Sequence, residues 1–193
     1  MTSQSSCAAS PLIRALASAV LVVSGFVACA PLPVESGSER LDENTGTTLT
    51  VMPRPVELVA ERPRGANRDP FAYLAPFQTN RMGDHELFLW VSAPQDAGPL
   101  ATPRVLCGEQ AVALEPLQGT LGDIGLSGPP YEAPAPWSAQ WYFRLTGEAL
   151  DCFVSARELR IETQAADQQE PARYVADARA LEPLTAFIAS LRT

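Results

Sequence analysis

The 193-residue sequence has no lysine, a single histidine, His85, and four cysteines. Its 14 basic residues are therefore all arginines, and with 22 acidic residues the formal net charge is −8. An acidic chain without a basic cluster is a poor match for the phosphate backbone of nucleic acids, and for anionic lipid through a basic face. A single histidine also leaves little material for Ser-His-Asp or Cys-His catalysis. The sequence has no glycine-rich phosphate loop between a strand and a helix, so we expect no cofactor.

The remaining sites for chemistry are sparse. His85 lies between Asp84 and Glu86, and neighbours on a strand point to opposite faces, so these side chains do not converge on a metal. The segment 125–128 is one residue short of a nucleophile elbow and has no strand-to-helix context. Carboxylates are numerous, and a glycosidase needs only two. A carboxylate-dependent hydrolase is therefore our third hypothesis for function.

Long hydrophobic runs are also missing, apart from residues 15–28. A bilayer-spanning helix needs about 20 apolar residues, whereas the core of a signal peptide needs roughly 7–15. Residues 15–28 fall in the second range, and the small residues Ser24, Gly25 and Ala28 lie near their end. By itself this segment is compatible with a secretory signal peptide or with an uncleaved membrane anchor.

The end of the segment reads Phe26, Val27, Ala28, Cys29. This pattern resembles the bacterial lipoprotein signal peptides, in which an apolar residue, a small or branched residue and Gly or Ala precede an invariant cysteine. The resemblance covers the first 29 residues. It implies cleavage between Ala28 and Cys29, a diacylglyceryl thioether on Cys29 and acylation of the new amino terminus, commonly by palmitate. Several acyl chains anchor a protein durably to a bilayer. Ala30 is not the aspartate that commonly retains this family in the inner membrane, so the resemblance implies the outer membrane, with the domain facing the periplasm.

The sequence after the cysteine predicts a tether. Residues 29–46 are rich in proline, serine, glycine and acid, and we expect them to be disordered. The 17 residues after Cys29 would reach roughly 20–25 Å as a coil. We therefore divide the chain into a signal peptide (1–28), a lipidated tether (29–46) and one β-rich domain (47–193).

Processing simplifies the cysteines. Cys7 leaves with the signal peptide, and Cys29 carries the lipid, so Cys107 and Cys152 remain. In an oxidising compartment, a single remaining pair favours a disulfide over two buried thiols.

The domain has a β pattern. Alternating or strongly apolar stretches predict strands at residues 47–52, 56–60, 86–92, 104–107, 110–115, 138–146, 152–156 and 158–163, with turns at 79–83 and 147–150. Residues 86–92 are apolar on both faces, which predicts a central strand covered on both sides. The prolines before residues 56–60 favour an edge strand there.

The end of the chain predicts one helix. Residues 184–191 have helical apolar spacing, and Pro183 suits the first turn of a helix. Residues 174–180 fit either a helical turn or a final strand. Together these patterns predict a mainly β, sandwich-like antiparallel domain with a short C-terminal helix.

A Gly- and Pro-rich stretch, 116–136, interrupts the strands and is followed by Trp137. Long irregular segments are often binding loops, although many simply vary. Our leading hypothesis is a non-catalytic protein-interaction domain that meets an unidentified envelope protein. The alternative is a glycan or small-ligand module that uses Tyr131 and Trp137 of this region, because exposed aromatic rings stack on sugars or anchor partners.

Overall fold

The computed structural model describes residues 37–62, 70–95, 100–165 and 169–192, all within one compact unit, Val34–Thr193. The strands are β1 (Ser38–Asp42), β2 (Thr47–Val51), β3 (Val56–Ala60), β4 (Phe71–Arg81), β5 (Asp84–Pro94), β6 (Arg104–Cys107), β7 (Gln110–Ala111), β8 (Glu115–Pro116), β9 (Ser138–Arg144), β10 (Glu158–Thr163) and β11 (Ala172–Asp177). The helices are the 3₁₀ helix η1 (Leu121–Ile124), α1 (Gly147–Ser155) and α2 (Glu182–Leu191). The expected signal peptide, its cleavage site after Ala28 and the lipidated Cys29 lie outside the described residues.

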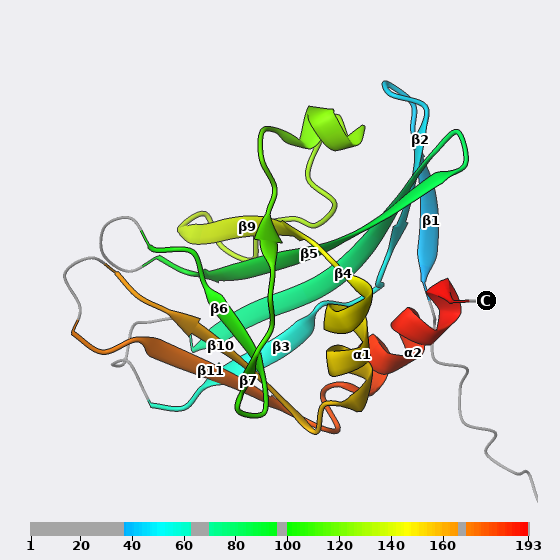
Figure 1. Cartoon of the computed structure of the whole chain (residues 1–193). Helices are drawn as coiled ribbons and strands as arrows, with labels where there is room; N and C mark the ends of the chain where they lie inside the picture. Colours follow the sequence, from blue (N-terminus) through cyan, green and yellow to red (C-terminus); the bar gives the residue numbers. More distant parts are fainter. Residues whose placement is uncertain (1–36, 63–69, 96–99, 166–168, 193) are drawn as a thin grey trace, which may run out of the picture. The chain divides into compact units, whose positions relative to one another are not determined.

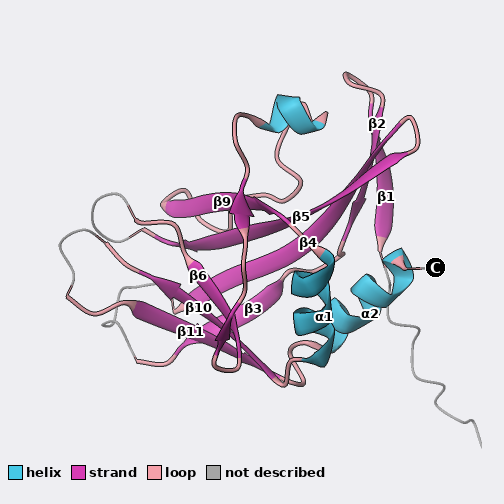
Figure 2. Cartoon of the chain, viewed as in Figure 1, coloured by secondary structure: helices cyan, strands magenta, loops and turns pink. Residues whose placement is uncertain are grey.

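The strands form one curled antiparallel sheet (Figures 1 and 2). Its main path runs β7-β6-β10-β11-β3-β4-β5-β9-β8, and β2 pairs with both β1 and β4. Because β7 and β8 end this path and only residues 112–114 separate them in the chain, the sheet curls back on itself. The predicted mainly β, sandwich-like antiparallel domain with a short C-terminal helix is confirmed. The strand that is apolar on both faces, β5, lies between β4 and β9, as predicted.

The sheet divides along β4. One edge of β4 pairs with β5, whereas the other pairs first with β3, through residues 71–74, and then with β2, through residues 77–80. Pro76 lies where the partner changes, and a strand tolerates a residue without an N–H best where the ladder is interrupted. The expected turn at 79–83 is therefore wrong in its first half, because β4 continues to Arg81.

Three other predictions of secondary structure need correction. Residues 110–115 form two short strands, β7 and β8, rather than one strand. Residues 147–155 form α1 rather than a turn and a strand. The hydroxyl of Thr146 accepts a hydrogen bond from the Ala149 N–H and caps the helix, and Leu150 and Phe153 are buried. Residues 56–60 form β3 as predicted, but β3 lies between β11 and β4 and is not an edge strand. The undecided segment near the end is resolved as strand β11.

The predicted tether is too long. Residues 38–42 form β1, which pairs with β2 along its whole length, and residues 43–46 form the turn between the two strands. The local composition is indeed polar, but pairing with the following strand β2 supplies backbone hydrogen bonds that a composition argument does not count. The ordered domain therefore begins at or before Gly37.

The helices cover part of the sheet. Leu184, Phe187 and Ile188 of α2 are fully buried, together with Phe153 of α1. Both helices lie side by side near the start of β1 (Figure 1). None of the helices in the described residues is long and apolar enough to cross a bilayer.

Three connections meet at one end of the domain. The pairing of Thr48 with Asn80 places the β1–β2 turn (43–46) beside the β4–β5 turn (82–83), and a hydrogen bond from Asn44 to Ser127 brings in the segment after η1. We call residues 43–46, 82–83 and 121–127 the turn end (Figure 1, upper right). The other end of β1, its start, lies away from the turn end. There Gly37 lines a pocket with residues of α2.

Candidate functional site

A disulfide joins Cys107, the last residue of β6, to Cys152 in α1, with Cα atoms 6.2 Å apart. The predicted bridge is confirmed, and the alternative of two free thiols is wrong. The bridge encloses a stretch with a sequence separation of 45 that contains the Gly/Pro-rich segment and strand β9. It therefore fixes both ends of the region that carries Tyr131 and Trp137.

The Gly/Pro-rich segment is attached to the sheet. Its side chains Ile124 and Leu126 are buried in the core. The guanidinium of Arg40 in β1 donates to the carbonyl of Pro130 at 3.1 Å, and the hydroxyl of Thr45 donates to the carbonyl of Gly125 at 2.6 Å. The N-terminal hairpin thus holds this segment against the domain.

Asp42 is the centre of this attachment. Its Oδ2 accepts a hydrogen bond from the Ser127 N–H at 2.7 Å, and the Ser127 hydroxyl and the Asn44 N–H also donate to its carboxylate. These hydrogen bonds, above all that from the Ser127 N–H, lower the pKa of Asp42. Because the group is exposed, its main effect is to position the segment after η1.

Acidification is expected to weaken this attachment. A carboxylate with a lowered pKa stabilises the folded form above its unfolded value of about 3.8, and the contribution is lost as the pH falls through the folded pKa. Ser127→Ala removes the hydroxyl donor and keeps the N–H, so it should raise the pKa of Asp42 partway. An NMR titration of the side-chain carboxyl carbons measures this. Asp123, whose pKa is lowered by the Thr120 N–H, is the internal control, and equal shifts at both groups would contradict the assignment.

Tyr131, predicted as a ligand residue, has a structural role. Its hydroxyl accepts from the Met52 N–H at 3.0 Å and donates to the Pro76 carbonyl at 2.7 Å. It therefore bridges the end of β2 to β4 at the point where the sheet divides. Its ring lies 5.0 Å from that of Trp90 and 6.5 Å from that of Phe77, and burial raises its pKa, so the hydroxyl keeps its proton.

Trp137, the other predicted ligand residue, lies elsewhere. Its side chain is 59 % exposed, and its carbonyl accepts from the Gln95 N–H. No ring contact among the described residues joins it to Tyr131. The structure therefore does not bring the two aromatic residues together as one binding platform.

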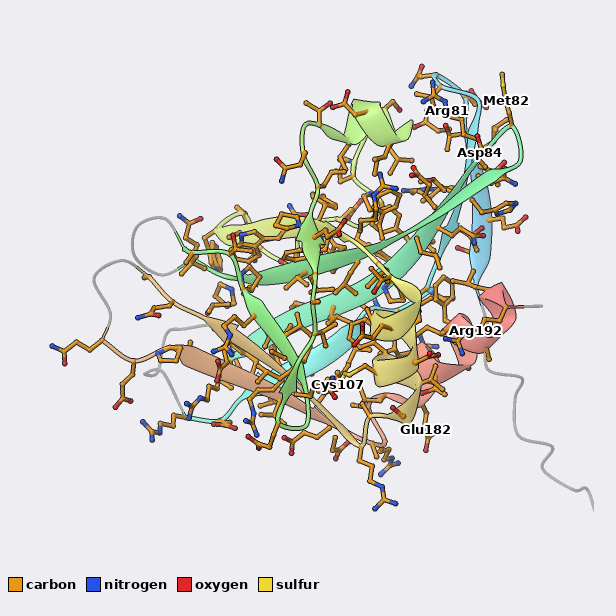
Figure 3. All side chains as sticks on the ribbon, viewed as in Figure 1. Arg81, Met82, Asp84, Cys107, Glu182 and Arg192 are labelled. Carbon is orange, nitrogen blue, oxygen red and sulfur yellow. A yellow bond between two sulfur atoms is a disulfide. The ribbon has the colours of Figure 1, made fainter. Side chains whose placement is uncertain are left out.

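The turn end contains a pocket of about 570 Å³, which we call the turn-end pocket. It is lined by Thr79, Arg81, Gly83, Asp84, His85, Glu86, Asp123 and Ile124. Met82 at the tip of the β4–β5 hairpin is fully exposed, and its side chain projects from the tip near Arg81 and Asp84 (Figure 3). Asp84, His85 and Glu86 are adjacent in the sequence. Asp123 joins them only because the Gly/Pro-rich segment folds against the β4–β5 hairpin.

The carboxylates of this pocket have other partners. Glu86 forms an ion pair with Arg144, and Asp123 accepts from the Thr120 N–H at 2.7 Å, which lowers its pKa. A general acid needs a pKa raised toward neutral pH, so Asp123 is unsuited to that role. Within the described residues, no three His, Cys, Asp or Glu side chains come together to hold a metal.

A second pocket, of about 540 Å³, lies beside the end of α2 and is lined by Gly37, Glu39, Thr50, Gln78, His85, Ser190 and Leu191. We call it the polar-face pocket. Sequence analysis missed it, because its residues come from five separate elements and only strand register brings them together. The one available signal was the alternation of Thr48 and Thr50 with Leu49 and Val51.

Comparison of the chain with protein-family models, with curated proteins and with solved structures finds no match.

Proposed function

We propose that the chain is a lipid-anchored envelope protein whose β domain is a non-catalytic protein-interaction module, with the turn end as its docking surface. Met82 carries this proposal. Its side chain is fully exposed, and a positive φ of 56° in a two-residue turn fixes its direction. An apolar side chain presented in this way gains free energy only when a partner covers it.

The proposed anchor keeps this surface close to a membrane. Seven residues lie between Cys29 and Gly37, and the eight steps from Cα to Cα span at most about 28 Å. Gly37 lies at the start of β1, beside α2, whereas the turn end lies past the other end of β1. A lipid on Cys29 would therefore keep the start of β1 within reach of the outer membrane, and a tether longer than the five-residue strand β1 leaves the turn end free to meet a partner in the periplasm.

The charges around Met82 favour a basic partner. The turn-end pocket is lined by three carboxylates, Asp84, Glu86 and Asp123, and by a single arginine, Arg81. Glu86 also forms an ion pair with Arg144, which does not line the pocket. Complementary charge mainly raises the rate and the specificity of association. Binding of the partner should therefore weaken at high salt.

Site-specific crosslinking in intact cells tests the proposal. A photo-crosslinking residue in place of Met82 should give one defined adduct, whereas the same residue in place of Val154, which is exposed on α1, should give none. Met82→Arg in a chain that carries the crosslinker at position 81 should abolish the adduct, since a positive side chain is costly to bury and repels a basic partner. Equal adducts at positions 82 and 154, or no adduct at either, would refute the docking surface.

The anchor is tested separately in the same cells. Cys29→Ser should move the protein from the membrane fraction to the soluble fraction, because the thioether cannot form. A variant that stays on the membrane would refute lipidation at Cys29 without bearing on the docking surface.

A further inference from the structure

Five polar side chains share one face of strands β2, β4 and β5. They are Thr48, Thr50, Gln78, Asn80 and His85. Register places Thr50 opposite Gln78, and Asn80 opposite both Thr48 and His85. Leu49, Phe77 and Thr79, which are neighbours of these residues along β2 and β4, point to the opposite face and are buried. We call this set the polar face.

The polar face has unused hydrogen-bonding capacity. Among the described residues, the side chains of Thr48, Thr50, Gln78 and His85 form no hydrogen bond. Asn80 uses only its oxygen, which accepts from the Gly83 N–H at 3.0 Å. Except for His85, these side chains are half-buried. Half-buried polar groups without protein partners must be satisfied by water or by a ligand.

The fold leaves this face open. Helix α2 ends beside it, and the polar-face pocket of about 540 Å³ lies between the helix end and the strands. Same-face side chains repeat about every 6.8 Å along a strand and about 4.8 Å between strands. The polar face is therefore a two-dimensional grid of hydroxyl, amide and imidazole groups, most of which both donate and accept.

The geometry points to a neutral glycan as the ligand, and we propose that the polar face binds one. Groups that both donate and accept match the hydroxyls of a sugar. Glu39 is the only carboxylate among the pocket residues, and the chain's net charge of −8 disfavours anionic polymers. Leu41, which is opposite Thr48 and 61 % exposed, offers an apolar surface to the C–H groups of a sugar ring.

A protein partner fits this face less well. Protein interfaces are enriched in aromatic residues and arginine at their centre. The polar face has neither, and the pocket residues include a single large apolar side chain, Leu191. This proposal rests on Thr50 and Gln78 and is independent of the docking surface at Met82, although His85 lines the pocket of each.

A titration of the full chain tests the inference. The protein is purified in a detergent without a sugar head group and titrated with hexamers of β-1,4-linked glucose, β-1,4-linked N-acetylglucosamine and α-1,4-linked glucose. We expect NMR shifts at Thr50 and Gln78 with at least one hexamer at millimolar concentration. Gln78→Ala should weaken that Kd about tenfold, as expected when an amide that makes one or two hydrogen bonds is removed.

Matched controls keep the test specific. Gln110→Ala removes the same group from the exposed strand β7 and should leave the Kd unchanged. Thr50→Val keeps the shape of the side chain and should also weaken binding. Two independent variants of the polar face are used so that a folding defect in either one does not decide whether the glycan binds there. Binding that Trp137→Ala abolishes, binding unaffected by both polar-face variants, or no binding by any hexamer would overturn the inference. The Met82 crosslink should persist in Gln78→Ala, which separates this outcome from the proposed function.

Discussion

Replacing Cys107 and Cys152 with serine should lower the free energy of unfolding by about 4 kcal/mol. The bridge spans a sequence separation of 45, and the chain-entropy model assigns about this value to a loop of that length. A domain is typically stable by only about 5–15 kcal/mol, so the double variant should lose a large fraction of its stability. Urea titration followed by tryptophan fluorescence measures the change.

The control for this prediction is Val154→Ser, an exposed position on the same helix, which should change stability by less than about 0.5 kcal/mol. The m-value needs comparison as well, because a disulfide also restricts the unfolded chain. A loss of less than about 1 kcal/mol in the double-serine variant would show that the enclosed segment, 107–152, is held mainly by its other contacts.

Tyr131→Phe is expected to cost about 1–3 kcal/mol for each backbone group that it leaves unpaired. The hydroxyl is the shared partner of the Met52 N–H and the Pro76 carbonyl, and its removal opens the connection between β2 and β4. The ring contact with Trp90 is kept, so the effect isolates the hydroxyl. Urea titration gives the stability, and hydrogen exchange of the Met52 amide reports the local opening.

The exposed ring provides the comparison. Trp137→Phe should have little effect on stability, because its side chain is 59 % exposed and no hydrogen bond among the described residues uses its indole N–H. If Tyr131→Phe were as mild as Trp137→Phe, the bridge would not stabilise the division of the sheet. The hypothesis from the sequence, that Tyr131 contacts a ligand, would then stand again beside the structural role.

Residue patterns were a good guide where a strand is half-buried. Residues 47–51, 138–144 and 158–163 alternate apolar and polar side chains, and each forms the expected strand. Alternation predicts a strand because successive side chains point to opposite faces. The same argument failed at residues 147–155, where a cap at Thr146 and the burial of Leu150 and Phe153 favour a helix.

The functional candidates were harder to predict. Tyr131 and Trp137 are close in the sequence, yet one joins the aromatic core and the other is exposed. Conversely, Thr50 and Gln78 are far apart in the chain and become neighbours through the register of β2 and β4. The separation of two residues in the sequence does not reveal whether they become neighbours in a sheet. That depends on which strands pair and on the register of the pairing.

The sequence by itself determined the β-rich class, the C-terminal helix and the one available pair of cysteines, since these follow from local periodicity and from counting. It also supplied the lipoprotein-like pattern at Cys29, whose test is the Cys29→Ser fractionation. Only the tertiary structure decided that residues 38–42 are a strand, that Pro76 lies where the sheet divides, and that the polar face lies open beside α2. These features depend on which strands pair and in which register, and such contacts leave no periodic signal in the chain.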